Sequence, residues 1–232
     1  MSDLRAFGIR LNVAAITNGE DVWEGTASTI PTAGEQMTTK STSTSDGPSG
    51  SGILTVKIKY LDNNGLDQSE TLTMNGTTEV DTTAINIRYI QEICTASVGS
   101  NGVAVGTISI YKKGAASTVY NTISPGYNCS MNTSRMVPAN NTLRIKSFSV
   151  SGADAATGQS INLLLRSTSD DAVLTSGIFH PIDSVLVYNS GIYREYFTSL
   201  TIPPFTIIKV TAYTSLVGQD VQASWEGILV PQ

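Results

Sequence analysis

ILTVKIKYL, residues Ile53–Leu61, is the stretch that decides the fold. Apolar and polar side chains alternate along it, and this period of two is typical of a β-strand with one buried face. The face that we expect to lie in the core carries Leu54, Val56, Ile58 and Tyr60. A turn sequence, Asp62-Asn63-Asn64-Gly65, follows, and residues Gln68–Met74 return as a second strand. The stretch therefore predicts an antiparallel hairpin.

The same pattern recurs along most of the chain, and helical periodicity is almost absent. Asn75-Gly76 is another tight-turn signal. From Asn141 onward we expect roughly seven or eight short strands, the number typical of a jelly roll or a related sandwich. The sequence therefore predicts an all-β, antiparallel β-sandwich of jelly-roll type. Further strands are expected over Ile85–Ala96, Gly106–Tyr111, Val119–Ile123, Thr142–Val150, Ser160–Ser167, Ile178–Tyr188, Arg194–Ile202, Ile207–Tyr213 and Val221–Val230.

Two of these strands predict which side chains share a face. The Ile85–Ala96 strand places Ile85, Ile87, Tyr89, Gln91 and Ile93 on one side. The Thr142–Val150 strand alternates without interruption, which puts Leu143, Ile145, Ser147 and Ser149 opposite Arg144, Lys146, Phe148 and Val150.

Composition predicts two β subdomains and an extended N-terminal arm. Residues 1–52 would form the arm and the first strands, residues 53–118 a first β region, and residues 119–232 the C-terminal jelly-roll-like sandwich. Met37–Gly52 is rich in Ser, Thr and Gly, which is typical of an extended arm or surface loop. Lys112–Ser117 (KKGAAS) is polar and is the candidate linker.

The charge balance excludes some partners. The 232 residues carry a net charge of −5, which argues against nucleic acid and anionic membranes because both bind basic patches. Charged residues make up 14%, below the ~25% of an ordinary soluble domain, while 29 Thr and 27 Ser supply uncharged polarity. A polar but weakly charged surface suits a subunit held in an assembly better than a free monomer.

The two cysteines, Cys94 and Cys129, are expected to be free thiols in a reducing compartment, with one disulfide as the alternative. No apolar run approaches the ~20 residues of a membrane span. The first residues, Met1–Arg5, lack the basic-then-apolar pattern of a signal peptide. We therefore expect synthesis in a cytoplasm.

The sequence predicts no catalytic, cofactor-binding or metal-ligating residues, and therefore no enzyme and no cofactor. His180 is the single histidine, so it cannot form a His-based metal site, and no G-x-S-x-G motif accompanies it. Asp62–Asp67 (DNNGLD) resembles a calcium loop but lacks the later bidentate Glu, which favours a hairpin turn. Neither a Rossmann fingerprint nor a P-loop motif occurs.

One tripeptide is repeated near the two ends, as Trp23-Glu24-Gly25 and Trp225-Glu226-Gly227. The favoured interpretation is a Trp that fills an edge of the core beside a Gly that allows a bulge. A Trp that stacks on a sugar is the alternative.

A series of motifs in a fixed order resembles virion structural proteins of tailed phages, especially phages of aquatic hosts such as cyanobacteria. Together these motifs extend over most of residues 20–230. In the first half they are Val22–Gly25, Ile30–Gly34, Ser41–Ser45, Thr55–Asp62, Glu70–Thr78, Arg88–Ile90 and Gly102–Ile108. In the second half they are Val137–Thr142, Ile202–Val210 and Trp225–Val230.

The resemblance implies a capsid cement or decoration protein on the capsid surface. Such a protein is a homotrimer at local three-fold positions, where it clamps neighbouring capsomers of the major capsid protein and stabilises the head. It would be synthesised in the cytoplasm of the bacterial host and would bind neither nucleic acid nor membrane. The alternative is a tail or neck component, or a β module that binds host glycans through Trp, Tyr and Asn. An enzyme such as a depolymerase is disfavoured by the lack of a catalytic motif.

Overall fold

The computed structural model describes residues 2–14, 19–25, 30–31, 33–153, 160–168, 178–188, 190–215 and 217–232. The secondary structure in these ranges consists of antiparallel strands, which confirms the predicted all-β class. The chain forms two compact units. Unit 1 comprises Met1–Glu24 and Asn132–Gln232, and unit 2 comprises Gly25–Met131.

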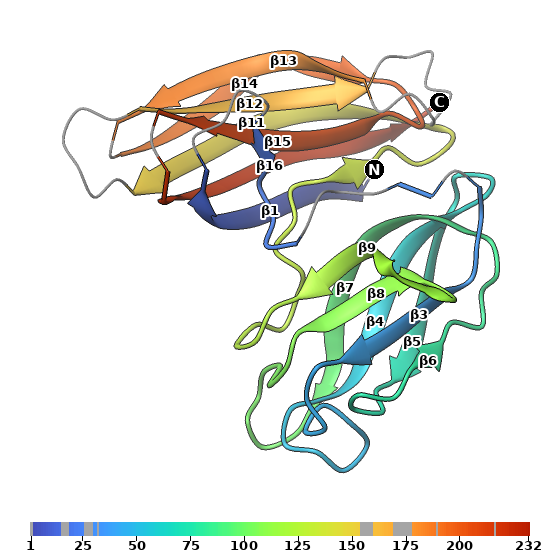
Figure 1. The fold of residues 1–232 in the computed structure, drawn as a ribbon. Helices are drawn as coiled ribbons and strands as arrows, with labels where there is room; N and C mark the ends of the chain where they lie inside the picture. Colours follow the sequence, from blue (N-terminus) through green and yellow to red (C-terminus); the bar gives the residue numbers. More distant parts are fainter. Residues whose placement is uncertain are drawn as a thin grey trace. The chain divides into compact units, whose positions relative to one another are not determined.

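Unit 1 is a jelly roll of two antiparallel sheets (Figure 1). Sheet A has the order β1-β16-β11-β14 and sheet B the order β10-β15-β12-β13. Along the chain, successive strands alternate between the two sheets except at β12 and β13, and this is the double Greek-key path of a jelly roll. Sheet A contains β1 (Ser2–Val13), β16 (Gln219–Pro231), β11 (Asn141–Ala153) and β14 (Gly191–Ile202). Sheet B contains β10 (Arg135–Met136), β15 (Ile207–Thr214), β12 (Ile161–Thr168) and β13 (Phe179–Val187).

Unit 2 is inserted in the chain between two short strands, β2 (Glu20–Asp21) and β10, that lie along the same edge of β15 in sheet B. Strand β2 precedes unit 2 and pairs with β15 at Thr211 and Ala212. Strand β10 follows unit 2 and pairs with the same strand at Ile207 and Ile208. Since β12 occupies the opposite edge of β15, β2 and β10 share one edge. The chain therefore leaves the jelly roll between two halves of one strand position and returns to it 107 residues later.

A bulge in β11 decides which of its residues enter the core of unit 1. Leu143 and Ile145 are buried, but beyond the bulge Phe148 and Val150 are the buried residues, although they were predicted to lie on the opposite face. The unpaired residue is Lys146, which is skipped between the pairs Ile145–Gly227 and Ser147–Glu226. The predicted uninterrupted alternation is therefore wrong, because one extra residue transfers the later side chains to the other face.

Gly227 allows this bulge. A Cβ atom on Gly227 would lie 2.7 Å from the carbonyl oxygen of Arg144, which is closer than real Cβ atoms approach backbone. The predicted association of the second Trp-Glu-Gly tripeptide with a bulge is confirmed.

Unit 2 is a second antiparallel sandwich whose two sheets enclose a separate core (Figure 1). Val56, Ile58 and Tyr60 are buried in this core, as the alternation of the opening stretch predicts, and Leu54 is half-buried. One sheet has the order β5-β4-β7, with β5 (Asp67–Thr73), β4 (Ile53–Asp62) and β7 (Ile87–Val98). The other has the order β6-β3-β8-β9, with β6 (Val80–Asp81), β3 (Met37–Ser41), β8 (Ile108–Lys112) and β9 (Ala115–Ile123).

The observed units differ from the expected regions 1–52, 53–118 and 119–232. The N-terminal residues do not form an arm, because β1 pairs with β16 from Ser2 to Val13 and β3 lies between β6 and β8. The candidate linker Lys112–Ser117 contains the end of β8, a tight turn at Lys113 and Gly114, and the start of β9, and Gly114 has φ +76°. Pairing between distant segments, rather than local composition, decides which strands share a core.

Two finer expectations also change. The predicted Ile85–Ala96 strand begins at Ile87, and Ile85 is exposed. The predicted shared face of Ile87, Tyr89, Gln91 and Ile93 is wrong, because the pairing with β4 skips Arg88 and Gln91 and the core takes Ile87, Ile90 and Ile93 instead. From Asn141 onward the described residues form six strands, β11–β16, rather than seven or eight. The jelly roll is completed by β1, β2 and β10, which come from before and directly after unit 2.

Cys94 and Cys129 form a disulfide within unit 2, so the expectation of two free thiols is wrong. The backbone holds the two segments together on both sides of the bond. The N–H of Thr95 donates to the carbonyl of Asn128 at 2.7 Å, and the N–H of Ser130 donates to the carbonyl of Ile93 at 2.9 Å. The disulfide thus attaches the segment that leaves unit 2 to strand β7.

Candidate functional site

The residues that the sequence singles out for chemistry occupy ordinary structural positions. His180 is exposed on β13, opposite Ser167 of β12. The carboxylate of Asp62 accepts the N–H groups of Asn64 at 2.8 Å and Leu66 at 3.0 Å, which confirms the hairpin turn. Within the described ranges, no cluster of three or more His, Cys, Asp or Glu could hold a metal ion. The same ranges contain no helix long and apolar enough to cross a membrane.

Both tryptophans are buried within unit 1. Trp225 is 1% exposed, and its indole N–H donates to the carbonyl of Thr133 at 2.8 Å. Trp23 is 3% exposed and lies beside Asn132. Neither ring offers a free face to a sugar, so the interpretation as core residues is confirmed and sugar stacking on these tryptophans is excluded.

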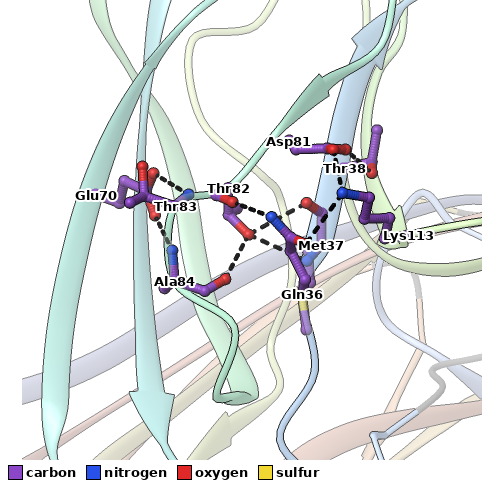
Figure 2. Close-up of polar contacts among 9 residues, drawn as sticks. All are labelled: Gln36, Met37, Thr38, Glu70, Asp81, Thr82, Thr83, Ala84 and Lys113. Carbon is purple, nitrogen blue, oxygen red and sulfur yellow. Dashed lines mark hydrogen bonds and ion pairs between the residues drawn. The ribbon is translucent and has the colours of Figure 1, made fainter.

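A polar network in unit 2 ties the segment after β6 to β3 and β5 (Figure 2). The hydroxyl of Thr82, which is buried, accepts the N–H of Met37 at 3.1 Å and lies 2.8 Å from the carbonyl oxygen of Ala84. Glu70 accepts the N–H groups of Thr83 at 2.6 Å and Ala84 at 3.2 Å. These side chains satisfy backbone groups of one short segment, so their role is to shape it.

Lys113 and Asp81 extend this network toward the surface (Figure 2). The Lys113 ammonium lies 2.6 Å from Asp81 and donates to Gln36 at 3.1 Å, and the Thr38 hydroxyl donates to Asp81 at 2.6 Å. The hydrogen bonds from Lys113 and Thr38 hold the pKa of Asp81 below its usual range. Because both groups of the ion pair reach solvent, the pair contributes little to stability.

Asp46 organises the loops at one end of unit 2. Its buried carboxylate accepts the Ser41 hydroxyl at 2.6 Å and the N–H groups of Ile53, Val105 and Gly106 at 2.9, 3.1 and 2.8 Å. Burial by itself would raise the pKa of Asp46, but these four hydrogen bonds outweigh it and lower the pKa. Because both of its oxygens accept hydrogen bonds inside the unit, this carboxylate is a structural group.

The two edge strands β13 and β14 of unit 1, one from each sheet, carry exposed apolar side chains. Strands β13 and β14 lie at the ends of their sheets, so within the described chain each has one neighbouring strand. Phe197 is 100% exposed, Tyr193 66% and Tyr188 58%. We call the exposed residues Leu186, Tyr188, Ile192, Tyr193 and Phe197 the apolar edge.

An acidic residue holds the two edge strands together. Asp183 of β13 accepts hydrogen bonds from the Arg194 guanidinium and the Tyr196 hydroxyl of β14. Burial, together with the hydrogen bond to Asp183, raises the pKa of Tyr196. These contacts tie β14 to β13, while the ladder of β14 with β11 covers residues 191–195 and 200–202, and Phe197 lies in the irregular stretch between them.

The outer face of sheet A carries a second candidate surface, a hollow of about 340 Å³. Ile9, Gln222 and Ser151 form one row across β1, β16 and β11, and they point away from the core because their neighbours Ala223 and Val150 are buried in it. The lining of the hollow is Ile9, Leu11, Ser151, Gly152, Ser190, Asp220, Val221 and Gln222.

The sequence predicted neither surface. The segment around β14 did contain a signal, because Tyr193, Tyr196 and Phe197 fall on both alternating faces of the strand. A strand with aromatic side chains on both faces either is buried on both or needs a partner. The hollow left no such signal, since its polar residues come from separate parts of the chain.

A scan against models of known protein families finds no match, and a search of curated proteins finds none either. Solved structures that align with the chain include particles of infectious bursal disease virus. Its T=1 particles give 13% identity and a TM-score of 0.29, over 99% of this chain and 69% of the other. The VP2 subviral particle of the same virus is 10% identical in sequence and gives a TM-score of 0.26. That alignment covers 99% of this chain and 72% of the other. At these TM-scores the likeness carries no inference about this chain.

Proposed function

We propose that this protein is a structural component of a tailed-phage particle, a capsid cement protein that binds the head and clamps neighbouring capsomers. The observation that carries the proposal is the apolar edge of unit 1. A long edge strand with exposed aromatic side chains is a template for association, and soluble monomers normally cover or charge such edges. A jelly roll that displays this edge is suited to a place between other subunits.

The proposed partners are the major capsid protein and further copies of this chain, as a homotrimer on the capsid surface. A specific interface buries ~1,200–2,000 Å² in total, and a few central aromatic residues contribute most of its binding energy. Phe197 and Tyr193 fit that role because their aromatic side chains are the most exposed in the apolar edge. Repeated over a symmetric shell, a modest contact becomes a multivalent clamp.

Other properties of the molecule agree with this role. The surface is polar with a small net charge, and the polar clusters in unit 2 serve local structure. The proposal includes the absence of enzymatic activity and synthesis in the host cytoplasm.

The test is to add the purified protein to heads that lack it and to measure bound protein and the temperature at which the heads release their DNA. We expect saturable binding and a higher release temperature. The variants Phe197→Ser and Tyr193→Ser should each weaken binding by about thirtyfold, the effect of losing a hot-spot residue. Ile85→Ser removes an apolar residue of unit 2 that is 70% exposed, close to the 66% of Tyr193, so it is the matched control and should bind normally.

Wild-type protein that neither binds heads nor protects them would refute the proposal. Adsorption to host cells without binding to heads would instead support the tail-component or glycan-binding alternative. Circular dichroism of each variant verifies folding, since the removed side chains are exposed and contribute little to the core.

A further inference from the structure

We propose that the hollow on the outer face of sheet A binds a neutral saccharide. The lining of the hollow contains no residue of the apolar edge, and sugar binding there does not depend on attachment to a head. Its volume of about 340 Å³ lies at the small end of the range for ligand pockets, which suits one or two sugar rings.

The polar lining matches the hydroxyl groups of a sugar. Ser151, Ser190 and Gln222 offer hydroxyl and amide groups that can both donate and accept. Within the described residues, the side chains of these three make no hydrogen bond to the protein, so their hydrogen-bonding capacity is available to a ligand.

A fixed carboxylate lies among these groups. Asn12 has φ +53° at an irregularity of β1, and its backbone N–H donates to Oδ1 of Asp220 at 2.9 Å. This hydrogen bond orients the carboxylate and leaves Oδ2 to accept from a ligand. A carboxylate oxygen is a strong acceptor for a sugar hydroxyl.

The apolar lining matches the C–H face of a sugar ring. Ile9 and Leu11 contribute one wall, and Leu11 is 48% exposed. The next row of sheet A places Phe7, which is 42% exposed, beside Ser224 on the same outer face. This exposed ring extends the surface on which a longer chain of sugars could pack.

Charge narrows the class of ligand. Asp220 is the ionisable residue in the lining, and the whole chain has a net charge of −5. An acidic sugar or a phosphate would therefore be repelled, whereas a neutral hexose or N-acetylhexosamine would not.

The experiment uses the intact protein and saturation-transfer NMR with methyl glycosides of glucose, galactose, mannose and N-acetylglucosamine. Glucuronic acid serves as the charged probe. We expect transfer to at least one neutral glycoside and none to glucuronic acid. A parallel adsorption assay with neutral polysaccharide isolated from host cells determines whether the ligand is a cell-surface glycan or a free sugar.

Two variants on the same face of β11 provide the matched comparison. Ser151→Tyr fills the hollow, whereas Ser147→Tyr adds the same ring four residues away, outside the lining. We expect Ser151→Tyr to weaken binding at least tenfold and Ser147→Tyr to leave it unchanged. Both variants should still bind heads, which separates this site from the proposed cement function.

Absence of transfer to every neutral probe would overturn the proposal. Equal binding by Ser151→Tyr and wild type would do the same, as would transfer to glucuronic acid alone.

Discussion

Removal of the Cys94–Cys129 disulfide should destabilise unit 2 and leave unit 1 unaffected. The bond joins residues 35 positions apart in the sequence. In the chain-entropy model, closing a loop of that length restricts the unfolded chain by about 4 kcal/mol at 25 °C. Both cysteines are half-buried, so Cys94→Ser with Cys129→Ser adds only a small cost in packing. We therefore expect the free energy of unfolding of unit 2 to fall by up to about 4 kcal/mol.

The two tryptophans allow each unit to be followed separately in the intact chain. Trp23 and Trp225 both belong to unit 1, so tryptophan fluorescence reports on that unit, whereas far-ultraviolet circular dichroism reports on both. In urea, the midpoint of the unit 2 transition seen by dichroism should fall by on the order of 2 M. This shift assumes that the free energy of unfolding decreases by about 2 kcal/mol per M urea. The fluorescence midpoint should stay in place.

The wild-type protein provides its own control. Reductant should shift the unit 2 transition of the wild type to that of the double serine variant, and it should not affect the variant. A dichroism midpoint that is identical with and without reductant would refute the reasoning, because the bond would then not constrain the unfolded chain.

Three further substitutions test the packing. Trp225→Phe leaves the carbonyl of Thr133 without its indole donor and should destabilise unit 1 by about 1–3 kcal/mol, measured by circular dichroism in urea. Gly227→Ala should cost about 1–3 kcal/mol in tryptophan-monitored unfolding because its Cβ meets backbone, and Gly191→Ala, which has ordinary clearance, should be nearly neutral. Asp46→Asn should destabilise unit 2 by about 1–3 kcal/mol at pH 7. The folded-state pKa of Asp46 is lowered, so its contribution to the stability of unit 2 is fully present above the ordinary value of ~3.9. That contribution is lost as the pH falls through the lowered pKa. The urea midpoints of wild type and variant should therefore converge in acid.

Local pattern identified the class of this protein and many of its strands. Alternation identified Val56, Ile58 and Tyr60 as core residues and predicted the β4–β5 hairpin, since side-chain direction in a strand depends only on position along it. Burial of the tryptophans was also the favoured interpretation. The all-β class follows from the same periodicity, which favours strands over helices along most of the chain.

What the sequence by itself could not determine was which strands pair. The split between β2 and β10, the bulge at Lys146 and the Cys94–Cys129 bond all depend on contacts between segments distant in the chain. The free energy of such contacts comes from burial in a shared core, and no local pattern encodes the partner. The apolar edge and the hollow likewise exist only once the jelly roll has determined which strands lie at its edges and which face of sheet A points outward.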